Sequence, residues 1–400
     1  MPDNYALEQR VRLHLDTLRT SGLDRALRLP SGIDLSSNDY LNVSRHPSIV
    51  ERFVECVRRE GCGSTGSRLL RGERDAFAQV ERRFAAFKRA ARALFFSSGY
   101  LANLGVLTTL IEEGDIAFSD QANHASLIDG LRLSKGRTVV FPHNDAGALR
   151  TKMQREQDAW RGQPSAGGIG TPGITFVVVE SVYSMDGDRA PLAEYAEMCR
   201  STGAVLIVDE AHAVGLYGER GSGLIEDAGL DHAHCVSINT AGKALGVAGA
   251  WVAGPAVVID YLLQRARPFV FSTAPPPALA GALEASLDLV EREPERRQRV
   301  SGLASFLRAR LGDHGIGVGA SASQIVPIVI GDNDRAVAVA RAVQAQGFDV
   351  RAIRPPSVPD GTARLRVSVN AGLSRDVLDR FVQTVAVAIR EAGVCPAVSS

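Results

Sequence analysis

The chain has 400 residues, of which 45% are hydrophobic and 22% are charged, as is typical of a globular protein with a sizeable core. Lys plus Arg and Asp plus Glu both number 45, so the composition gives no indication of binding to nucleic acid or to an anionic membrane. The length favours one large and one smaller domain, and no apolar run is long enough to span a membrane.

The first twenty residues, MPDNYALEQRVRLHLDTLRT, are charged and amphipathic and lack the apolar core of a signal peptide. They predict a single amphipathic helix with an arginine-rich tail over residues 1–30. The five cysteines are scattered and form no CxxC pair, which favours a reducing compartment and argues against a zinc site. We therefore expect a cytoplasmic protein without a bound metal ion.

Between residues 41 and 285, apolar strand-like runs alternate with segments of helical periodicity. The runs are ARALFFSS, GDIAFSD, RTVVFPH, ITFVVVES, AVLIVDE, HCVSIN and AGAWVAG. This alternation predicts βα units around a mostly parallel sheet that is covered on both faces. The Gly- and Pro-rich segment 161–173 is expected to interrupt it as a surface loop.

A charge-rich segment, EREPERRQR, follows the apolar helix PALAGALEASLDLVE and indicates a domain boundary. The remainder predicts a small α/β domain in the order helix, strand (QIVPIVIG), helix, strand (FDVRAIR), strand (ARLRVSV), helix. The expected division is an N-terminal helix and arm over 1–40, a large domain over 41–285 and a small domain over 286–400. No internal repeat is present.

Polar side chains that can carry chemistry follow three of the predicted strands. Asp209 ends one strand and precedes His212, Ser184 follows a second, and Thr240 and Lys243 follow a third. The carboxyl ends of parallel strands lie at one edge of a sheet, where active sites gather. A lysine in an apolar site becomes a nucleophilic amine, and a buried carboxylate needs a cationic partner. Together these groups suit pyridoxal 5'-phosphate (PLP), whose ring nitrogen, aldehyde and phosphate need such partners.

Each of these residues also has a purely structural explanation. Lys243 could end a helix, Asp209 could cap one, His212 could be a core histidine and Ser184 a turn residue. Three strand ends that all carry such groups favour the cofactor site. A nucleotide-driven motor is a second interpretation, because VLIVDEAH resembles a Walker B box. The phosphate loop GxxxxGK[ST] is missing, however, since Ala244 follows Lys243, and this interpretation fails.

From LSSNDYL (35–41) to about residue 385, the chain resembles the α-oxoamine synthases, a family of fold-type I PLP enzymes. The matching segments are FFSSGYLANLGVL, NHASLIDG, ESVYSMDGDRAPL, VDEAHAVGLYGERGSG, NTAGKALGVAGAWVAG, ARPFVFSTAPPP and AIRPPSVPDGTARLRVSV. The resemblance implies an aspartate aminotransferase-like α/β fold, with a mostly parallel seven-stranded sheet in the large domain. The last two segments are most similar to the branch that serves biotin synthesis.

The resemblance also implies roles around the cofactor. Lys243 would bind PLP covalently and later move the α-proton of the amino acid. Asp209 would pair with the ring nitrogen, His212 would hydrogen-bond the phenolic oxygen, and His124 would stack on the ring. The other contacts would come from the backbone of Gly99 and Tyr100, from Ser184 and Thr240, and from Thr273, which would reach the phosphate site of a second subunit in a homodimer.

Substrate contacts follow from the same resemblance. Asn38 and Arg354 would hold the amino acid carboxylate, a task that suits the guanidinium fork. His124 would face the substrate, and Arg25 and Ser357 would contact the acyl thioester. The segment between Arg25 and LSSNDYL is shorter than is usual in the family.

The implied reaction is a decarboxylative condensation of L-alanine with a pimeloyl thioester, which releases CO2 and the thiol carrier. Both pimeloyl-coenzyme A and the pimeloyl acyl-carrier protein remain open as donors. The alternative is another α-oxoamine synthase, such as a glycine C-acetyltransferase or a serine palmitoyltransferase, with a different amino acid or acyl chain.

Overall fold

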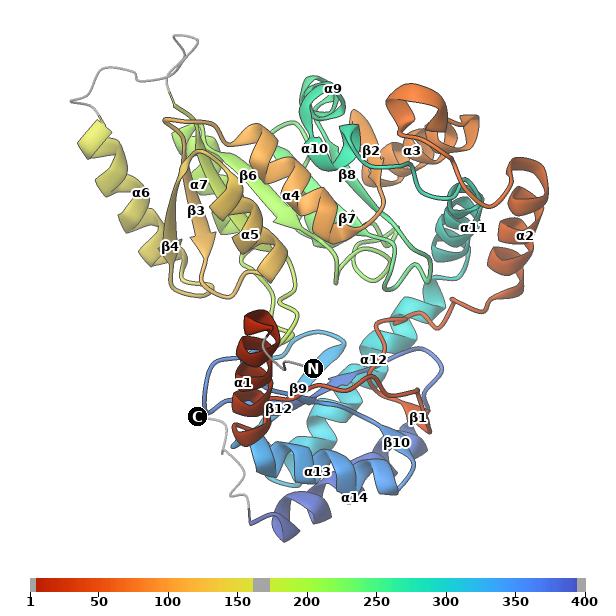
Figure 1. The fold of residues 1–400 in the computed structure, drawn as a ribbon, viewed down its shortest axis with the longest axis vertical. Helices are drawn as coiled ribbons and strands as arrows, with labels where there is room; N and C mark the ends of the chain where they lie inside the picture. The colour runs from red at the N-terminus through yellow and green to blue at the C-terminus, as the bar shows by residue number, and fades with distance from the viewer. Residues whose placement is uncertain (1–4, 161–172, 394–400) are drawn as a thin grey trace. The chain divides into compact units, whose positions relative to one another are not determined.

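The computed structural model describes residues 5–160 and 173–393, which form two compact units (Figure 1). The larger unit contains Asn38–Ser184 and Asp188–Val300, and the smaller contains Met1–Ser37, Met185–Gly187 and Ser301–Ser400. Except for Gly173, the surface loop expected over 161–173 lies outside the described residues.

The larger unit is built on a seven-stranded sheet, and its strands are the seven apolar runs expected from the sequence. In spatial order they are β2 (Arg92–Phe96), β8 (Ala250–Gly254), β7 (Cys235–Thr240), β6 (Val205–Asp209), β5 (Thr175–Glu180), β3 (Ile116–Asp120) and β4 (Arg137–Phe141). Only β8 runs antiparallel to its neighbours within this sheet. The prediction of a mostly parallel seven-stranded sheet is confirmed.

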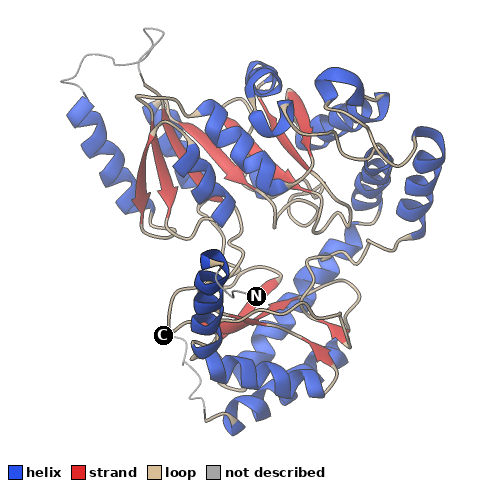
Figure 2. Cartoon of the chain, in the orientation of Figure 1, coloured by secondary structure: helices blue, strands red, loops and turns tan. Residues whose placement is uncertain are grey.

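Helices cover both faces of this sheet, which explains why its strands are continuous apolar runs rather than alternating ones (Figure 2). One face packs on α4 (Gly99–Leu110), α5 (Ala125–Leu133), α9 (Ala256–Arg265) and α10 (Arg267–Val270). On the other face, Phe84 of α3 (Asp75–Lys88) stacks on Trp251 with ring centroids 4.2 Å apart. Other helices in this part of the chain are α2 (Pro47–Glu60), η1 (Arg68–Gly72), α6 (Ala146–Trp160), α7 (Leu192–Thr202), α8 (Leu224–Asp227) and α11 (Ala278–Arg292).

The smaller unit has a three-stranded antiparallel sheet in the order β11-β12-β9, and a separate parallel pair, β1-β10. The strands are β9 (Ile325–Gly331), β11 (Ala352–Ile353), β12 (Ala363–Ser368), β1 (Ile33–Asp34) and β10 (Phe348–Asp349). The helices are α12 (Pro294–Asp313), which begins in the larger unit, α13 (Asn333–Ala345), α14 (Arg375–Glu391) and α1 (Ala6–Thr20).

The expected strand FDVRAIR is divided into β10 and β11, which belong to different sheets. The cause is long-range pairing, because β10 aligns with β1 near the N-terminus while β11 aligns with β12. The prediction of one continuous strand is therefore wrong, although the order of the other elements in this domain is confirmed.

The N-terminal helix is shorter than predicted, because α1 ends at Thr20 rather than near residue 30. Gly22 adopts a φ of 62°, its N–H bonds to the carbonyl of Arg19, and the N–H of Leu23 bonds to that of Leu18. This pair of bonds is a Schellman motif, which ends the helix, and a glycine at this position adopts the required positive φ without steric cost. The arginine-rich tail is thus an irregular segment. Within the described ranges, no helix combines the length and the apolar character needed to cross a membrane.

Candidate active site

Asp209 is the last residue of β6, and two donors hold its buried carboxylate in a fixed orientation. Oδ1 accepts the backbone N–H of Ala211 at 2.8 Å, and Oδ2 accepts the side-chain amide of Asn103 at 2.8 Å. Asn103 lies on α4, one helical turn after Gly99, and its amide also donates to the hydroxyl of Ser126 at 2.8 Å. A buried, oriented carboxylate of this kind stabilises a protonated ring nitrogen.

Four side chains form a hydrogen-bonded chain from Lys243 to Asn38. Lys243 lies in the loop between β7 and β8, and its Nζ is 2.8 Å from Nε2 of His212. Nδ1 of His212 is 2.7 Å from the Tyr40 hydroxyl, which donates to Oδ1 of Asn38 at 2.9 Å. Because the phenol has one proton, it accepts from Nδ1–H, and Nε2 is left as the acceptor that faces the Lys243 amine.

Gly99 and Thr240 form a cradle at the start of α4. A Cβ atom at position 99 would lie 3.4 Å from Cβ and 3.5 Å from Oγ1 of Thr240, so a side chain there would fill the space beside the helix N-terminus. Ser98 caps the helix by accepting the N–H of Leu101 at 3.3 Å. The Tyr100 side chain is directed to Asp129, with 2.6 Å between the hydroxyl and Oδ2. Backbone N–H groups at a helix start, next to a hydroxyl, favour a phosphate.

His124 is the N-cap of α5, and its Nδ1 lies 2.8 Å from the hydroxyl of Ser126. Partial burial lowers the pKa of His124 below its usual value of 6.5, and the positive charge of Lys243 adds to this, although Asp209 acts in the opposite direction. The imidazole is therefore neutral near pH 7. Ser126 connects His124 to Asn103, and through it to Asp209.

Glu180 is a second buried carboxyl group that the sequence analysis did not select. It ends β5 and aligns with Asp209 in the parallel register, and its Oε1 has no hydrogen-bond partner among the described residues. Burial, together with the neighbouring charge of Asp209, raises the pKa of Glu180 well above its usual value of 4.5. The neutral form of Glu180 is therefore favoured beside Asp209, since two charged carboxylates this close together would repel each other. The signal in the sequence was the glutamate at the end of FVVVE.

A buried ion pair between Lys88 and Glu210 lies next to the end of β6. Lys88 donates to Glu210 and, at 2.6 Å, to the carbonyl of Ser222, while Glu210 accepts the N–H of Ile225 at 3.0 Å. Both charged side chains are fully buried. The pair thus fixes both ends of the segment from 210 to 225, which carries His212, and removal of one partner would leave an uncompensated buried charge.

The segment that carries Ser184 is anchored by His143. Its Nδ1 lies 2.8 Å from Asp120, at the end of β3, and its Nε2 lies 2.8 Å from Asp188. Partial burial by itself lowers the pKa of His143, but the hydrogen bonds and charges of the two carboxylates outweigh it and raise the pKa to about 10. Ser184 itself lies four residues beyond β5.

We expect His143 to stabilise the protein in a pH-dependent manner. Its folded pKa of about 10 exceeds the unfolded value of 6.5, so the contribution is complete below pH 6.5 and is lost as the pH rises through 10. Hydrogen bonds to charged groups contribute about 1.5–3 kcal/mol, so His143→Gln should lower the free energy of unfolding by about 2 kcal/mol at pH 6. Urea denaturation at pH 6, 8 and 10 measures this difference. A difference that does not shrink between pH 6 and pH 10 would contradict the assignment.

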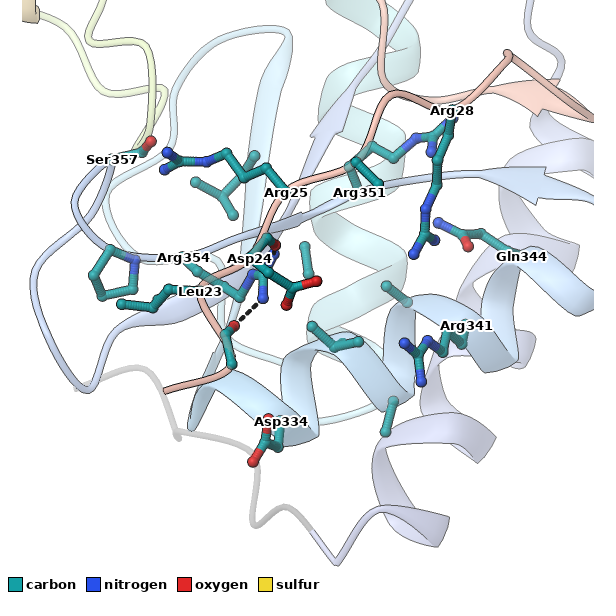
Figure 3. Close-up of a pocket in the computed structure, with 18 of the residues that line it drawn as sticks. Leu23, Asp24, Arg25, Arg28, Asp334, Arg341, Gln344, Arg351, Arg354 and Ser357 are labelled. Atoms are coloured by element: carbon teal, nitrogen blue, oxygen red, sulfur yellow. Dashed lines mark hydrogen bonds between the residues drawn. The ribbon is translucent and has the colours of Figure 1, made fainter. Parts of the chain in front are cut away.

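The remaining predicted residues are placed as follows. Thr273 is exposed and follows α10 by three residues. Arg25, Arg354 and Ser357 line one cavity of the smaller unit (Figure 3), whereas Asn38 belongs to the larger unit. The joint binding of a carboxylate by Asn38 and Arg354 stays a prediction. Arg366, a buried arginine of β12 that donates to the Ser368 hydroxyl at 2.9 Å, is a second guanidinium that sequence reasoning did not select.

The larger unit therefore brings together an amine, an imidazole acceptor, an oriented carboxylate and a cradle for an anion. These groups match the aldehyde, phenolic oxygen, ring nitrogen and phosphate of PLP, so the residues present fit that cofactor. No group of three or more His, Cys, Asp or Glu that could hold a metal ion occurs among the described residues.

Comparisons with known proteins agree with this site. The family model "Aminotransferase class I and II" matches residues 30–385. An 8-amino-7-oxononanoate synthase of Marinobacter nauticus is 41% identical over 386 residues, which cover 93% of this chain and 94% of the relative. One from Mycolicibacterium gilvum is 43% identical over 364 residues, which cover 90% of this chain and 91% of the relative.

Two solved structures show the same fold. A serine palmitoyltransferase from S. paucimobilis with bound PLP-myriocin aldimine superimposes with a TM-score of 0.87 and 27% identity, covering 98% of this chain and 100% of that one. The 8-amino-7-oxononanoate synthase of Francisella tularensis gives a TM-score of 0.75 and 27% identity, covering 91% and 99%. The predicted fold-type I architecture and the PLP cofactor are confirmed. The chain belongs to the aminotransferase class I and II family, and within it to the α-oxoamine synthases that include the 8-amino-7-oxononanoate synthases.

Proposed function

We propose that this chain condenses L-alanine with a pimeloyl thioester to give 8-amino-7-oxononanoate. This is the product from which its relatives take their name. The observation that carries the proposal is the placement of the Lys243 amine 2.8 Å from a His212 acceptor nitrogen, beside the oriented carboxylate of Asp209. In this reaction the α-carbon of alanine bonds to the acyl carbonyl carbon and the C–S bond breaks. The alanine carboxyl group leaves as CO2, and the overall reaction takes up one proton.

When bound, PLP withdraws electrons from the α-carbon of the amino acid. Lys243 would remove the proton from that carbon and return one after CO2 has left, with His212 as the neighbouring acceptor that orients its amine. Asp209, whose two oxygens each accept a hydrogen bond from a fixed donor, would hold the ring nitrogen protonated. Gly99, Tyr100 and Thr240 would bind the phosphate. Ser184 and His124 would lie against the ring.

We further propose that the protein works as a homodimer in which Thr273 reaches the phosphate site of the second subunit. Exposed apolar side chains support this, since Leu70 of η1 is 84% exposed and Phe271, just after α10, is 71% exposed. A second copy would remove such side chains from water. The chain has a mass of 42.6 kDa, and sedimentation at twice this mass is the expected result. A fully active monomer would contradict the shared site.

The test of the reaction is product identification by mass. The purified, PLP-loaded protein is incubated with alanine, glycine or serine, each with pimeloyl-coenzyme A or the pimeloyl acyl-carrier protein. Alanine should be preferred over glycine by roughly 10–200-fold in kcat/KM, because one methyl group in an apolar pocket contributes only about 1–3 kcal/mol. A preference for glycine or serine would assign the chain to a sister branch and leave the lysine chemistry intact.

The amino acid carboxylate needs a separate test, because two arginines compete for it. Arg354→Lys keeps the charge but loses the planar fork, so it should raise the KM for alanine strongly without removing the cofactor absorbance. Arg366→Lys is the matched comparison from β12. If only Arg366→Lys raises the KM for alanine, the carboxylate belongs to Arg366 and Arg354 has another role.

A further inference from the structure

The smaller unit contains a cavity of about 590 Å³ whose lining is dominated by arginine. Six arginines line it against two aspartates, Asp24 and Asp334. The arginines come from α1, from the irregular segment after it, from α13 and from the region of β11: Arg19, Arg25, Arg28, Arg341, Arg351 and Arg354. In Figure 3, Arg25 and Ser357 lie toward one end of the cavity, whereas Arg28, Arg341 and Gln344 lie toward the other.

Two of these guanidinium groups pair with carboxylates, and a third, that of Arg354, donates to backbone carbonyls. Arg19 pairs with Asp16 at 2.9 Å and Arg351 with Asp349 at 2.8 Å. For Arg25, Arg28 and Arg341, by contrast, no carboxylate lies within 4.0 Å in the part of the chain that the structure describes. Like charges that share one cavity repel each other, and an anion bound between them relieves that repulsion.

Arg354 stabilises one wall of this cavity through hydrogen bonds. Its guanidinium donates to the carbonyl of Gly22 and, at 2.9 Å, to that of Asp24, which ties the segment with Arg25 and Arg28 to the rest of the unit. Gly22 packs so closely on α13 that a Cβ atom there would lie 2.8 Å from Oδ1 of Asp334. The segment is thus fixed beside α13, the helix that carries Arg341.

We propose that the Arg28 and Arg341 end of this cavity binds the phosphate groups of the carrier that delivers the acyl chain. The inference rests on the proposed function, because the resemblance places Arg25 and Ser357, at the opposite end, with the acyl thioester. One carboxylate occupies one guanidinium fork, whereas phosphate esters carry up to two charges and several acceptor oxygens that match a cluster of forks. A volume of 590 Å³ also lies within the range of about 300–1,000 Å³ that is usual for small-molecule and cofactor sites.

The phosphate that this site recognises has two sources. Both coenzyme A and the prosthetic arm of an acyl-carrier protein contain 4'-phosphopantetheine, and coenzyme A adds a diphosphate and a 3'-phosphate. Titration calorimetry of the PLP-loaded protein with coenzyme A, 3'-dephospho-coenzyme A, 4'-phosphopantetheine and pantetheine separates these contributions. We expect affinity to fall in that order, and the affinity for coenzyme A to weaken as salt rises.

Arg28→Ala and Arg341→Ala should each weaken coenzyme A binding by about tenfold, which corresponds to the loss of one charge-assisted contact. Their affinity for pantetheine should not change. Both side chains are exposed, so the variants should fold normally. Arg390→Ala is the matched control, because this exposed arginine of the same unit does not line the cavity.

Equal affinity for coenzyme A and pantetheine, or variants that bind coenzyme A like the wild type, would overturn the phosphate site. A second outcome would also overturn it. If pimeloyl-coenzyme A binds more tightly than heptanoyl-coenzyme A, and Arg28→Ala removes only this difference in affinity, then Arg28 binds the acyl carboxylate and not a phosphate. Failure of the condensation assay with every substrate pair would instead refute the proposed function. The order of affinities measured by calorimetry would then still test the phosphate site, because binding needs no turnover.

Discussion

Lys243→Ala should abolish condensation while the protein stays folded and still binds PLP without a covalent bond. Lys243 lies 2.8 Å from His212, and alanine supplies no amine to bind the aldehyde or to move the α-proton. The wild-type protein should be yellow, and borohydride should fix the cofactor on the peptide that contains Lys243. The measurements are turnover with alanine and pimeloyl-coenzyme A, the visible spectrum and peptide mass mapping after reduction.

The chain makes this experiment unusually easy to interpret, because it has four lysines in total, at positions 88, 135, 152 and 243. Lys135→Ala is the matched control, since Lys135 is exposed and should keep both the label and the activity. A label on any other lysine, or a colourless wild-type protein after incubation with PLP, would refute the assignment of Lys243. Residual turnover in Lys243→Ala equal to that of the control would do the same.

The sequence was sufficient to locate the strands and the residues at their ends. Strands such as TFVVVE and VLIVD are buried on both faces, so burial alone makes them continuous apolar runs that are easy to recognise. Once the strands were located, the candidate site residues could be selected at their ends, where parallel sheets gather reactive groups. These residues are Asp209, Thr240 and Lys243. The end of α1 was also readable in principle, since SGL carries the glycine of a Schellman motif.

The supporting contacts could not be predicted in this way. Tyr40 lies 172 residues from His212, and Asn103 lies 106 residues from Asp209, so no local spacing relates the partners. The raised pKa of Glu180 depends on its burial and on its alignment with Asp209 in the neighbouring strand, which only the sheet order reveals. The division of FDVRAIR has the same origin, because β10 pairs with a strand more than 300 residues earlier.

Asp209→Asn should lower turnover by about 10²–10³, the usual effect of removing one oriented electrostatic contact from an active site. The substitution keeps the size of the side chain but removes the charge that would hold the ring nitrogen protonated. It also disturbs the local hydrogen bonds. Both oxygens of Asp209 accept from donors, Ala211 N–H and the Asn103 amide, whereas an asparagine can accept with only one of its two terminal atoms. Turnover and the cofactor absorbance spectrum are the measurements.

Glu180→Gln is the variant that separates charge from geometry. Glu180 is the neighbouring buried carboxyl group, and its pKa is raised well above 4.5 by burial and by Asp209, which favours its neutral form. Exchanging one neutral group for another of the same shape should change turnover by no more than a few-fold and leave the spectrum unaltered. If Glu180→Gln instead costs as much as Asp209→Asn, the negative charge of the pair resides on Glu180, and the ring nitrogen must be assigned to that residue. If neither variant lowers turnover tenfold, the strand-end carboxylates do not support the cofactor at all, and the role given to Asp209 is wrong.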